Sequence, residues 1–425
     1  MILWVCIIIF VVLLLIGAPI ILCLGIPPVV WLLQNGAIPN MVMGQKMFSA
    51  VDSFALMAIP FFMLAGQVME RTGITEAIVD FANAVIGWVR GGLACTVELA
   101  GMLMAGISGS SNADASALGA ICLRALKKGG YDEGMASAIV VSASGIGPII
   151  PPSIIMIVYA TAAGLDIGQL FTAGIVPGIC LGVAYMIVSV RYARKHNIPK
   201  IPFQGFKHVW NTFKKAVWAL LMPVIIIGGI LGGLFTATEC GVIATVYGII
   251  YGFAVKKLRI RDLWESLREG ILAAVGPISL IAISSIFSYM LAREGVTASI
   301  AAFLENNITS QFGVMAFCAV VCIVAGCFVD GTATMLLLTP IFVPVVNAMG
   351  IDMMQFSIIF MIAIMSGGMT PPVGSMLFVI SGIDGTPISK MVKPVIPFMI
   401  ALIVIIILIM LIPGIASGLP GLIYG

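Results

Sequence analysis

Residues 145–153 read Gly-Ile-Gly-Pro-Ile-Ile-Pro-Pro-Ser, inside an apolar stretch that runs from about 134 to 164. The three prolines of this segment remove three backbone donors and free the carbonyl groups one turn earlier, whereas a simple kink needs only one proline. We therefore expect a discontinuous helix over 134–164, in which the freed carbonyl oxygens of Gly147 and Ile150 can bind a small cation.

A second interruption lies at 367–374, which reads Gly-Gly-Met-Thr-Pro-Pro-Val-Gly inside the apolar stretch 356–383. Four short motifs recur in the same order at a nearly constant offset of 220 or 222 residues, which indicates an internal repeat. The pairs are Arg71-Thr-Gly-Ile-Thr with Arg293-Glu-Gly-Val-Thr, Ser108-Gly-Ser with Asp330-Gly-Thr, Pro151-Pro152 with Pro371-Pro372, and Pro177 with Pro397.

A polar cluster precedes each interruption. Residues 106–114 read Gly-Ile-Ser-Gly-Ser-Ser-Asn-Ala-Asp in the apolar segment 92–126, and residues 330–334 read Asp-Gly-Thr-Ala-Thr in the segment 312–349. Polar groups are costly in lipid. Close helix packing would need only small residues, whereas the first cluster also offers three hydroxyls, an amide and a carboxylate. We expect two re-entrant hairpins with these clusters at their tips.

The composition requires a lipid environment. Hydrophobic residues make up 61% of the 425 residues and charged residues 9%, whereas soluble domains have about 25% charged residues. Because only helices and closed barrels satisfy backbone hydrogen bonds in lipid, we expect an all-α polytopic membrane protein. The chain has two histidines and no phosphate-binding loop, which argues against histidine catalysis, zinc and nucleotide binding. The nine cysteines contain no Cys-x-x-Cys pair and read as small buried hydrophobes.

The distribution of basic residues predicts the topology, because cytoplasmic loops are enriched in Lys and Arg. Seven of the 21 basic residues fall in 191–215 without any acid. One path of the chain across the membrane places all basic residues on the cytoplasmic side except Lys46 and Arg293. It treats 1–33 as a single retained span with an inside N-terminus. The chain then divides into an inverted repeat at 1–190, a basic loop with a connecting helix at 191–238, and a second repeat at 239–425.

Transporters with inverted repeats bind substrates and ions where interrupted helices meet at the bilayer midplane. Carbonyl and hydroxyl oxygens without a carboxylate cage favour sodium over magnesium or calcium. Asp330 occupies the position of Ser108 in the other repeat, and it could ligate sodium, carry a proton or bind substrate hydroxyls. Arg293 could pair with a carboxylate or serve as an interface anchor. We interpret Asp114 and Glu98 as helix-end or interface charges rather than substrate ligands.

At these motifs the chain resembles the large membrane subunit of tripartite ATP-independent periplasmic (TRAP) transporters. The resemblance covers nearly the whole chain and implies an elevator-type transporter of the bacterial inner membrane, driven by two or more sodium ions, and not an enzyme. It implies two protein partners, a separate four-helix membrane subunit and a periplasmic binding protein that delivers an organic acid. Nucleic acid is not an expected partner. Family substrates include C4-dicarboxylates and sialic acids, and the general likeness favours sialic acid slightly.

The resemblance also implies the site residues. One sodium site maps to Ser108, Ser110, Gly147, Ile150 and Pro152. A second maps to Gly326, Thr332, Thr334, Gly367, Thr370 and Met376, and the substrate to Ser108, Ser110, Asp330 and Arg293. The main alternative is a stand-alone sodium- or proton-coupled carboxylate carrier of the citrate type that needs no binding protein. A channel is disfavoured, because two half-helix sites suit alternating access better than a continuous pore.

Overall fold

The computed structural model describes residues 2–34, 39, 41–308, 310–371 and 374–425, and every regular element in these ranges is a helix. Within the described chain, seven helical segments are long and apolar enough to cross a membrane, which agrees with the prediction of an all-α polytopic protein. They are Phe54–Arg71, Ile167–Lys195, Phe206–Leu231, Ala237–Ala254, Ile260–Arg293, Gly331–Ala348 and Ile388–Leu411.

The prediction of one N-terminal span over 1–33 was wrong. The structure has two short helices instead, α1 (Ile2–Leu15) and α2 (Ile20–Gln34). Gly17 between them has a φ of +74°, a conformation that glycine adopts without strain, and Pro19 follows it. The Sγ of Cys6 donates a hydrogen bond to the carbonyl of Pro27 across the pair, so the two helices lie antiparallel.

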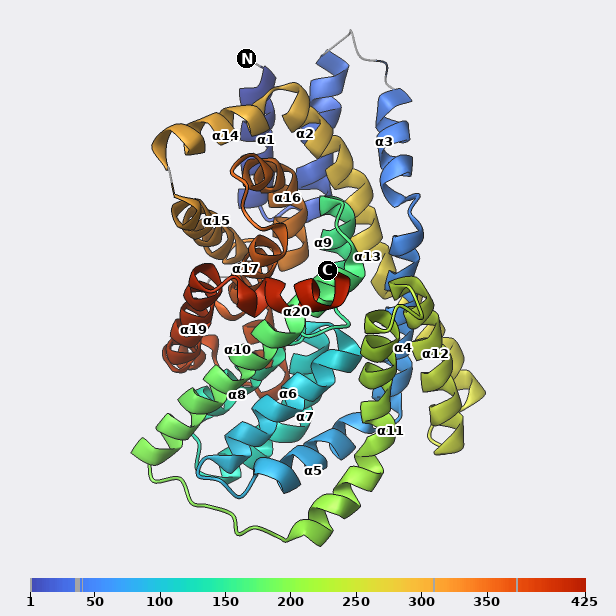
Figure 1. The fold of residues 1–425 in the computed structure, drawn as a ribbon, viewed down its shortest axis with the longest axis vertical. Helices are drawn as coiled ribbons and strands as arrows, with labels where there is room; N and C mark the ends of the chain where they lie inside the picture. Colours follow the sequence, from blue (N-terminus) through green and yellow to red (C-terminus); the bar gives the residue numbers. More distant parts are fainter. Residues whose placement is uncertain (1, 35–38, 40, 309, 372–373) are drawn as a thin grey trace.

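The antiparallel arrangement of α1 and α2 also places the N-terminus on the opposite side of the membrane from the predicted one. The indole Nε1 of Trp31, near the end of α2, donates a 2.6 Å hydrogen bond to Oε1 of Glu294. The first residues of α1 therefore lie at the same end of the molecule as Arg293, which is the end predicted to face outward (Figure 1). An inside N-terminus does not fit this arrangement.

The first repeat contains a helical hairpin followed by a broken helix. The hairpin is α6 and α7, and the broken helix is α8 and α9, with residues 145–153 between them. The bounds are α3 (Met41–Val51), α4 (Ala58–Arg71), α5 (Ile74–Ile86), α6 (Gly92–Ser108), α7 (Ser111–Lys128), α8 (Glu133–Ser144), α9 (Ile154–Ala163) and α10 (Ile167–Lys195).

The second repeat has the same order of elements, with a hairpin of α15 and α16 and a broken helix of α17 and α18. Pro372 of the predicted break lies outside the described residues. The connecting helix between the repeats is α11 (Phe206–Leu231). The bounds in the second repeat are α12 (Ala237–Ala254), α13 (Ile260–Arg293), α14 (Val296–Asn307), α15 (Gln311–Gly326), α16 (Gly331–Ala348), α17 (Met353–Ser366), α18 (Ser375–Asp384), α19 (Ile388–Leu411) and α20 (Gly414–Tyr424).

The helices form two groups (Figure 1). One group places α4 against α12 and α13, with α11 packed on α12 and on α5. The other group contains both hairpins and both broken helices, together with α10 and α19. The first hairpin lies in the lower half of Figure 1 and the second in the upper half. The two hairpins therefore approach the middle of the second group from opposite ends.

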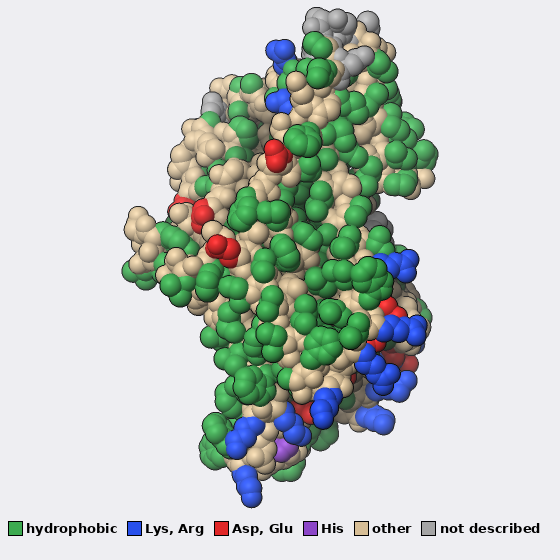
Figure 2. Space-filling model, turned by 90° about the vertical axis from the view of Figure 1, so that its right-hand side faces the viewer, with side chains coloured by type: hydrophobic (Ala, Val, Ile, Leu, Met, Phe, Trp, Pro, Cys, Tyr) green, Lys and Arg blue, Asp and Glu red, His purple; other side chains and the backbone are tan. Residues whose placement is uncertain are grey.

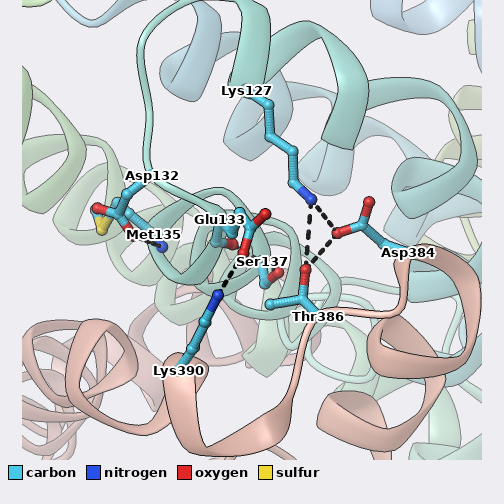
Figure 3. Close-up of polar contacts among 8 residues, drawn as sticks. All are labelled: Lys127, Asp132, Glu133, Met135, Ser137, Asp384, Thr386 and Lys390. Carbon is cyan, nitrogen blue, oxygen red and sulfur yellow. Dashed lines mark hydrogen bonds and ion pairs between the residues drawn. The ribbon is translucent and has the colours of Figure 1, made fainter.

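Ion pairs join the two repeats at the basic end of the molecule (Figure 3). Nζ of Lys127, at the end of α7, lies 2.5 Å from Oδ2 of Asp384 at the end of α18. Nζ of Lys390 lies 2.9 Å from Oε2 of Glu133 at the start of α8. The hydrogen bond and positive charge of Lys390 hold the pKa of Glu133 below its usual range. Each repeat thus contributes one acid and one base to this contact.

The charge distribution predicts which residues can be labelled from each side. Figure 2 shows Lys and Arg side chains gathered at the lower end, below a broad band of hydrophobic side chains. Cysteines that replace the exposed Lys200 and Ser389 should react with an impermeant maleimide only from the cytoplasm. A cysteine at the exposed Asn347 should react only from the periplasm, and the parent chain corrects for the native cysteines. Periplasmic labelling at position 389 would contradict the inverted orientation of the second repeat.

Candidate cation and substrate site

The tip of the first hairpin packs directly on the first helix break. Gly109 ends α6 with a φ of +58°, and a methyl group placed on it would lie 2.6 Å from the carbonyl oxygen of Pro152. Only glycine allows so close a backbone approach with this φ. Ser153 then begins α9, and its hydroxyl accepts a hydrogen bond from the amide of Met156. The structure therefore brings the predicted residues 108–110 and 147–152 together.

Asp114 is the central polar residue of this contact. Its side chain is fully buried, and its Oδ1 accepts a 2.6 Å hydrogen bond from the hydroxyl of Ser108. Its Oδ2 has no hydrogen-bond partner among the described residues, although it faces Gly147, where a methyl group would lie 2.5 Å away. A buried ionised carboxylate with an unsatisfied oxygen is unfavourable unless a cation compensates its charge or a proton neutralises it. We predicted that Asp114 is a helix-end or interface charge, and it lies in the first turn of α7. The sequence did not predict that its carboxylate faces Gly147.

Backbone carbonyls complete an oxygen-rich environment at the break. In the described part of the chain, no hydrogen bond reaches the carbonyl oxygens of Gly147, Ile150 or Pro152. The Ile150 side chain points away from the tip, toward Gly178 on α10. The carbonyl oxygen of Pro152 lies against Gly109, and Oδ2 of Asp114 lies against Gly147. Carbonyl and carboxylate oxygens are ligands that fit a hard cation such as sodium.

The second tip packs on the second break in the same way. Gly326, at the end of α15, contacts Gly367 so closely that a methyl group on Gly326 would lie 3.2 Å from the Cα of Gly367. The carbonyl of Gly326 accepts no hydrogen bond within the described residues. The sulfur-bearing side chain of Met376 is buried next to Gly368. Two predicted residues of this site, Gly326 and Gly367, are therefore in direct backbone contact.

The threonines of the second site have different surroundings. The hydroxyl of Thr334 is 3.4 Å from the carbonyl of Val329, and its side chain is fully buried. Thr370 donates its hydroxyl to the carbonyl of Ser366, so its oxygen retains only its acceptor capacity. Thr332 lies at the tip itself. Its amide donates to Oδ1 of Asp330, which makes Asp330 the N-cap of α16.

The two tips line one cavity of about 120 Å³. Polar side chains from both repeats line it, including Ser110 and Asn112 from the first tip and Asp330 and Thr332 from the second. Pro277 of α13 closes one side. Of the predicted substrate residues, Ser110 and Asp330 lie in this cavity. Ser108 lies behind Ser110 and instead lines a neighbouring cavity together with Asp114 and Glu70.

Arg293 does not lie among the residues that line the cavity between the tips. It follows Pro277 by sixteen residues on the same helix, which corresponds to about 24 Å at 1.5 Å per residue. Its guanidinium carbon lies 5.8 Å from the ring centroid of Tyr289, close to the other outer base, Lys46. This position fits the anchor interpretation of Arg293 and does not support the predicted contact with substrate.

Comparison with known proteins identifies the family. A model of the family described as "Tripartite ATP-independent periplasmic transporter, DctM component" matches residues 7–415. The chain belongs to this family. It is a TRAP permease, a multi-pass protein of the bacterial inner membrane, and not an enzyme.

The names of similar TRAP permeases specify different acids as substrates. It is 35% identical to a C4-dicarboxylate TRAP transporter large permease protein of Pseudomonas aeruginosa, over 88% of each chain. It is 34% identical to a sialic acid TRAP transporter permease protein of Haemophilus influenzae, over 89% of this chain and 62% of that one.

The fold of this TRAP permease also resembles solved transporter structures. The YdaH transporter of Alcanivorax borkumensis superimposes with a TM-score of 0.65 at 15% identity, over 89% of this chain and 88% of that one. MtrF of Neisseria gonorrhoeae gives a TM-score of 0.63 at 13% identity, over 87% and 83%. At these identities the likeness concerns the fold alone.

Proposed function

We propose that this TRAP permease imports an organic acid across the inner membrane and couples this import to the entry of sodium ions. The observation that carries the proposal is the meeting of the two polar tips, one from each repeat, in a single cavity next to backbone oxygens that lack partners. The relatives named for C4-dicarboxylates and sialic acid support an organic acid as the substrate.

The coupling follows from the position of the cation sites beside the substrate cavity. A sodium ion between Asp114 and the carbonyls near Gly147 would hold the first tip against its helix break. The adjacent Ser110 faces the substrate cavity, so a cation behind it fixes the shape of the cavity. Sodium and substrate then each favour the conformation that the other binds, which is thermodynamic coupling.

We propose an elevator movement for the transport step. The group of helices that contains both tips and both breaks would slide as one body along α4 and α13. The ion pairs Lys127–Asp384 and Lys390–Glu133 support this idea, because they join the two repeats within the moving group (Figure 3). The two cavities beside the first tip lie between this group and α4.

Two partner proteins belong to the proposal, a small four-helix membrane subunit and a periplasmic binding protein that delivers the substrate. The family description names a tripartite transporter, and an Oleidesulfovibrio alaskensis relative named DctMQ is 33% identical over 96% of this chain but only 64% of its own length.

Uptake by proteoliposomes tests the proposed function. The permease and its small subunit are reconstituted, and uptake of labelled succinate and sialic acid is measured with the cognate binding protein. We expect uptake only with an inward sodium gradient, with no effect of ATP. Uptake that is independent of the sodium gradient contradicts the coupling. Full uptake without the binding protein supports the stand-alone carrier instead.

Removing one hydroxyl from each tip should weaken the response to sodium. Ser110→Ala and Thr332→Ala each delete one oxygen at the tips, a loss of roughly 1–3 kcal/mol of interaction free energy. We expect a higher sodium concentration for half-maximal uptake in both variants, at unchanged expression. Ser417→Ala, far along the chain in α20, removes a hydroxyl that bonds only to the Pro413 carbonyl and serves as the control. Wild-type sodium dependence in both tip variants would exclude the two-site assignment.

A further inference from the structure

A groove with a basic rim runs along the lower part of α10. It lies between α10 and the turn at 87–91 that connects α5 to α6. The turn fits tightly against α10, because Gly91 has a φ of +80° and a methyl group on it would lie 2.9 Å from the Cβ of Ala193. The tight contact fixes one side of the groove relative to the other.

Four basic side chains line the rim of the groove: Arg90, Arg191, Arg194 and Lys200. No Asp or Glu is among the described residues that line it, and none of the four basic groups forms an ion pair with a described side chain. The one polar contact of Arg90 is a 3.4 Å hydrogen bond to Oδ1 of Asn197. The rim therefore has an excess of positive charge.

The wall of the groove is apolar and exposed. Val183, Ile187 and Val190 follow one another along one face of α10, at the spacing of successive helical turns. Val183 and Ile187 are 46% and 63% exposed. Trp88 stands at the rim, and its ring lies 5.8 Å from that of Phe203. Aromatic rings of this kind concentrate at the level of lipid headgroups.

We propose that this groove binds an anionic phospholipid of the leaflet at the basic end of the molecule. The basic rim would hold the phosphate, and an acyl chain would lie along Val183 and Ile187. Basic pockets between helices at the cytoplasmic side are suited to anionic headgroups. An anionic protein segment would satisfy the rim but would leave the apolar wall on α10 exposed to lipid.

The enrichment of basic residues at cytoplasmic ends does not explain this arrangement by itself. Lys207, Lys214 and Lys215 on α11 also belong to the basic residues enriched at the cytoplasmic end, but they do not line the groove. These three lysines are exposed, and Lys214 stacks over the ring of Trp210. The three arginines of the rim and these three lysines carry the same total charge at the same end of the molecule, so they provide a matched comparison.

Native mass spectrometry of the full-length chain tests the proposal. Phosphatidylglycerol, phosphatidylcholine with the same acyl chains, and inorganic phosphate are titrated separately. We expect the wild type to bind phosphatidylglycerol at least about tenfold more tightly than phosphatidylcholine, because Lys and Arg groups near the membrane surface attract anionic headgroups. The triple variant R90Q/R191Q/R194Q should lose this preference, whereas K207Q/K214Q/K215Q should keep it.

Three outcomes would overturn the proposal. The first is a wild-type chain that binds both phospholipids equally. The second is an equal loss of phosphatidylglycerol binding in the two triple variants. The third is inorganic phosphate that competes fully with the lipid at equal concentration, which indicates a free-anion site. The single variants Arg191→Gln and Arg194→Gln repeat the measurement with little risk to folding, since both side chains are exposed.

Discussion

Asp330→Asn is expected to lower substrate uptake at least about tenfold, a loss of roughly 1.4 kcal/mol of transition-state stabilisation. Asp330 lines the cavity between the tips, and the substituted amide keeps its shape but removes its charge. Asparagine also keeps the N-cap of α16, because an amide oxygen can accept the hydrogen bond from the amide of Thr332. Uptake by proteoliposomes between pH 6 and pH 8 measures the effect.

A second substitution and a matched control separate charge from folding. Asp330→Ser reproduces the residue of the first repeat and is also a good N-cap, so we expect a similar loss of uptake with normal insertion. Asp352→Asn is the control, because Asp352 caps α17 through the amides of Met354 and Gln355 but does not line the cavity. Near-normal uptake by Asp330→Asn would mean that the carboxylate is incidental to substrate binding.

Asp114→Asn is expected to raise the sodium concentration for half-maximal uptake at least about tenfold. The substitution retains the hydrogen bond from Ser108 and removes the negative charge that faces Gly147. The amide nitrogen would also place hydrogen-bond donors where a cation needs oxygen ligands. Sodium titration of uptake in proteoliposomes, together with a sodium-dependent melting temperature in detergent, measures this change.

Glu98→Gln is the matched control for Asp114→Asn. Glu98 is also a fully buried carboxyl group of the first hairpin, and its Oε1 accepts a 2.9 Å hydrogen bond from the hydroxyl of Ser142 on α8. Its Oε2, like Oδ2 of Asp114, has no hydrogen-bond partner among the described residues. It does not line either cavity beside the first tip. We expect normal sodium dependence in this variant. If Asp114→Asn responds to sodium as the wild type does, the first cation site is assigned to the wrong residues.

The parts of the candidate site that depend on residues close together in the sequence could be predicted from the sequence. Prolines and glycines restrict the backbone of their own segment, so the breaks at 145–153 and 367–374 could be read directly. The polar clusters at 108–110 and 330–332 stood out against apolar surroundings for the same reason. The offset of the repeat then related the two tips. The role that we propose for Asp114 was not predicted, because it depends on a contact with Gly147, more than thirty residues later.

The errors at the N-terminus and at Arg293 have physical causes. An apolar stretch of the length of 1–33 suits one span by hydropathy, and the turn at Gly17 and Pro19 is only a short interruption. Whether this turn separates two helices depends on the packing of α2 on α13, and a hydropathy profile does not describe such packing. The family resemblance implied a substrate contact for Arg293, with an interface anchor as the alternative, and the 34-residue helix α13 places it away from the tips.

The sequence by itself determined the membrane class, the helical content, the positions of both breaks and the polar tips. These properties depend on the composition and on the conformational limits of glycine and proline, which act within a few residues. Only the tertiary structure decided which oxygens share a cavity, that Asp114 faces the first break, and that the basic rim near Arg191 borders an apolar groove. Such contacts join segments that are distant in sequence, and the free energy of packing between helices selects them.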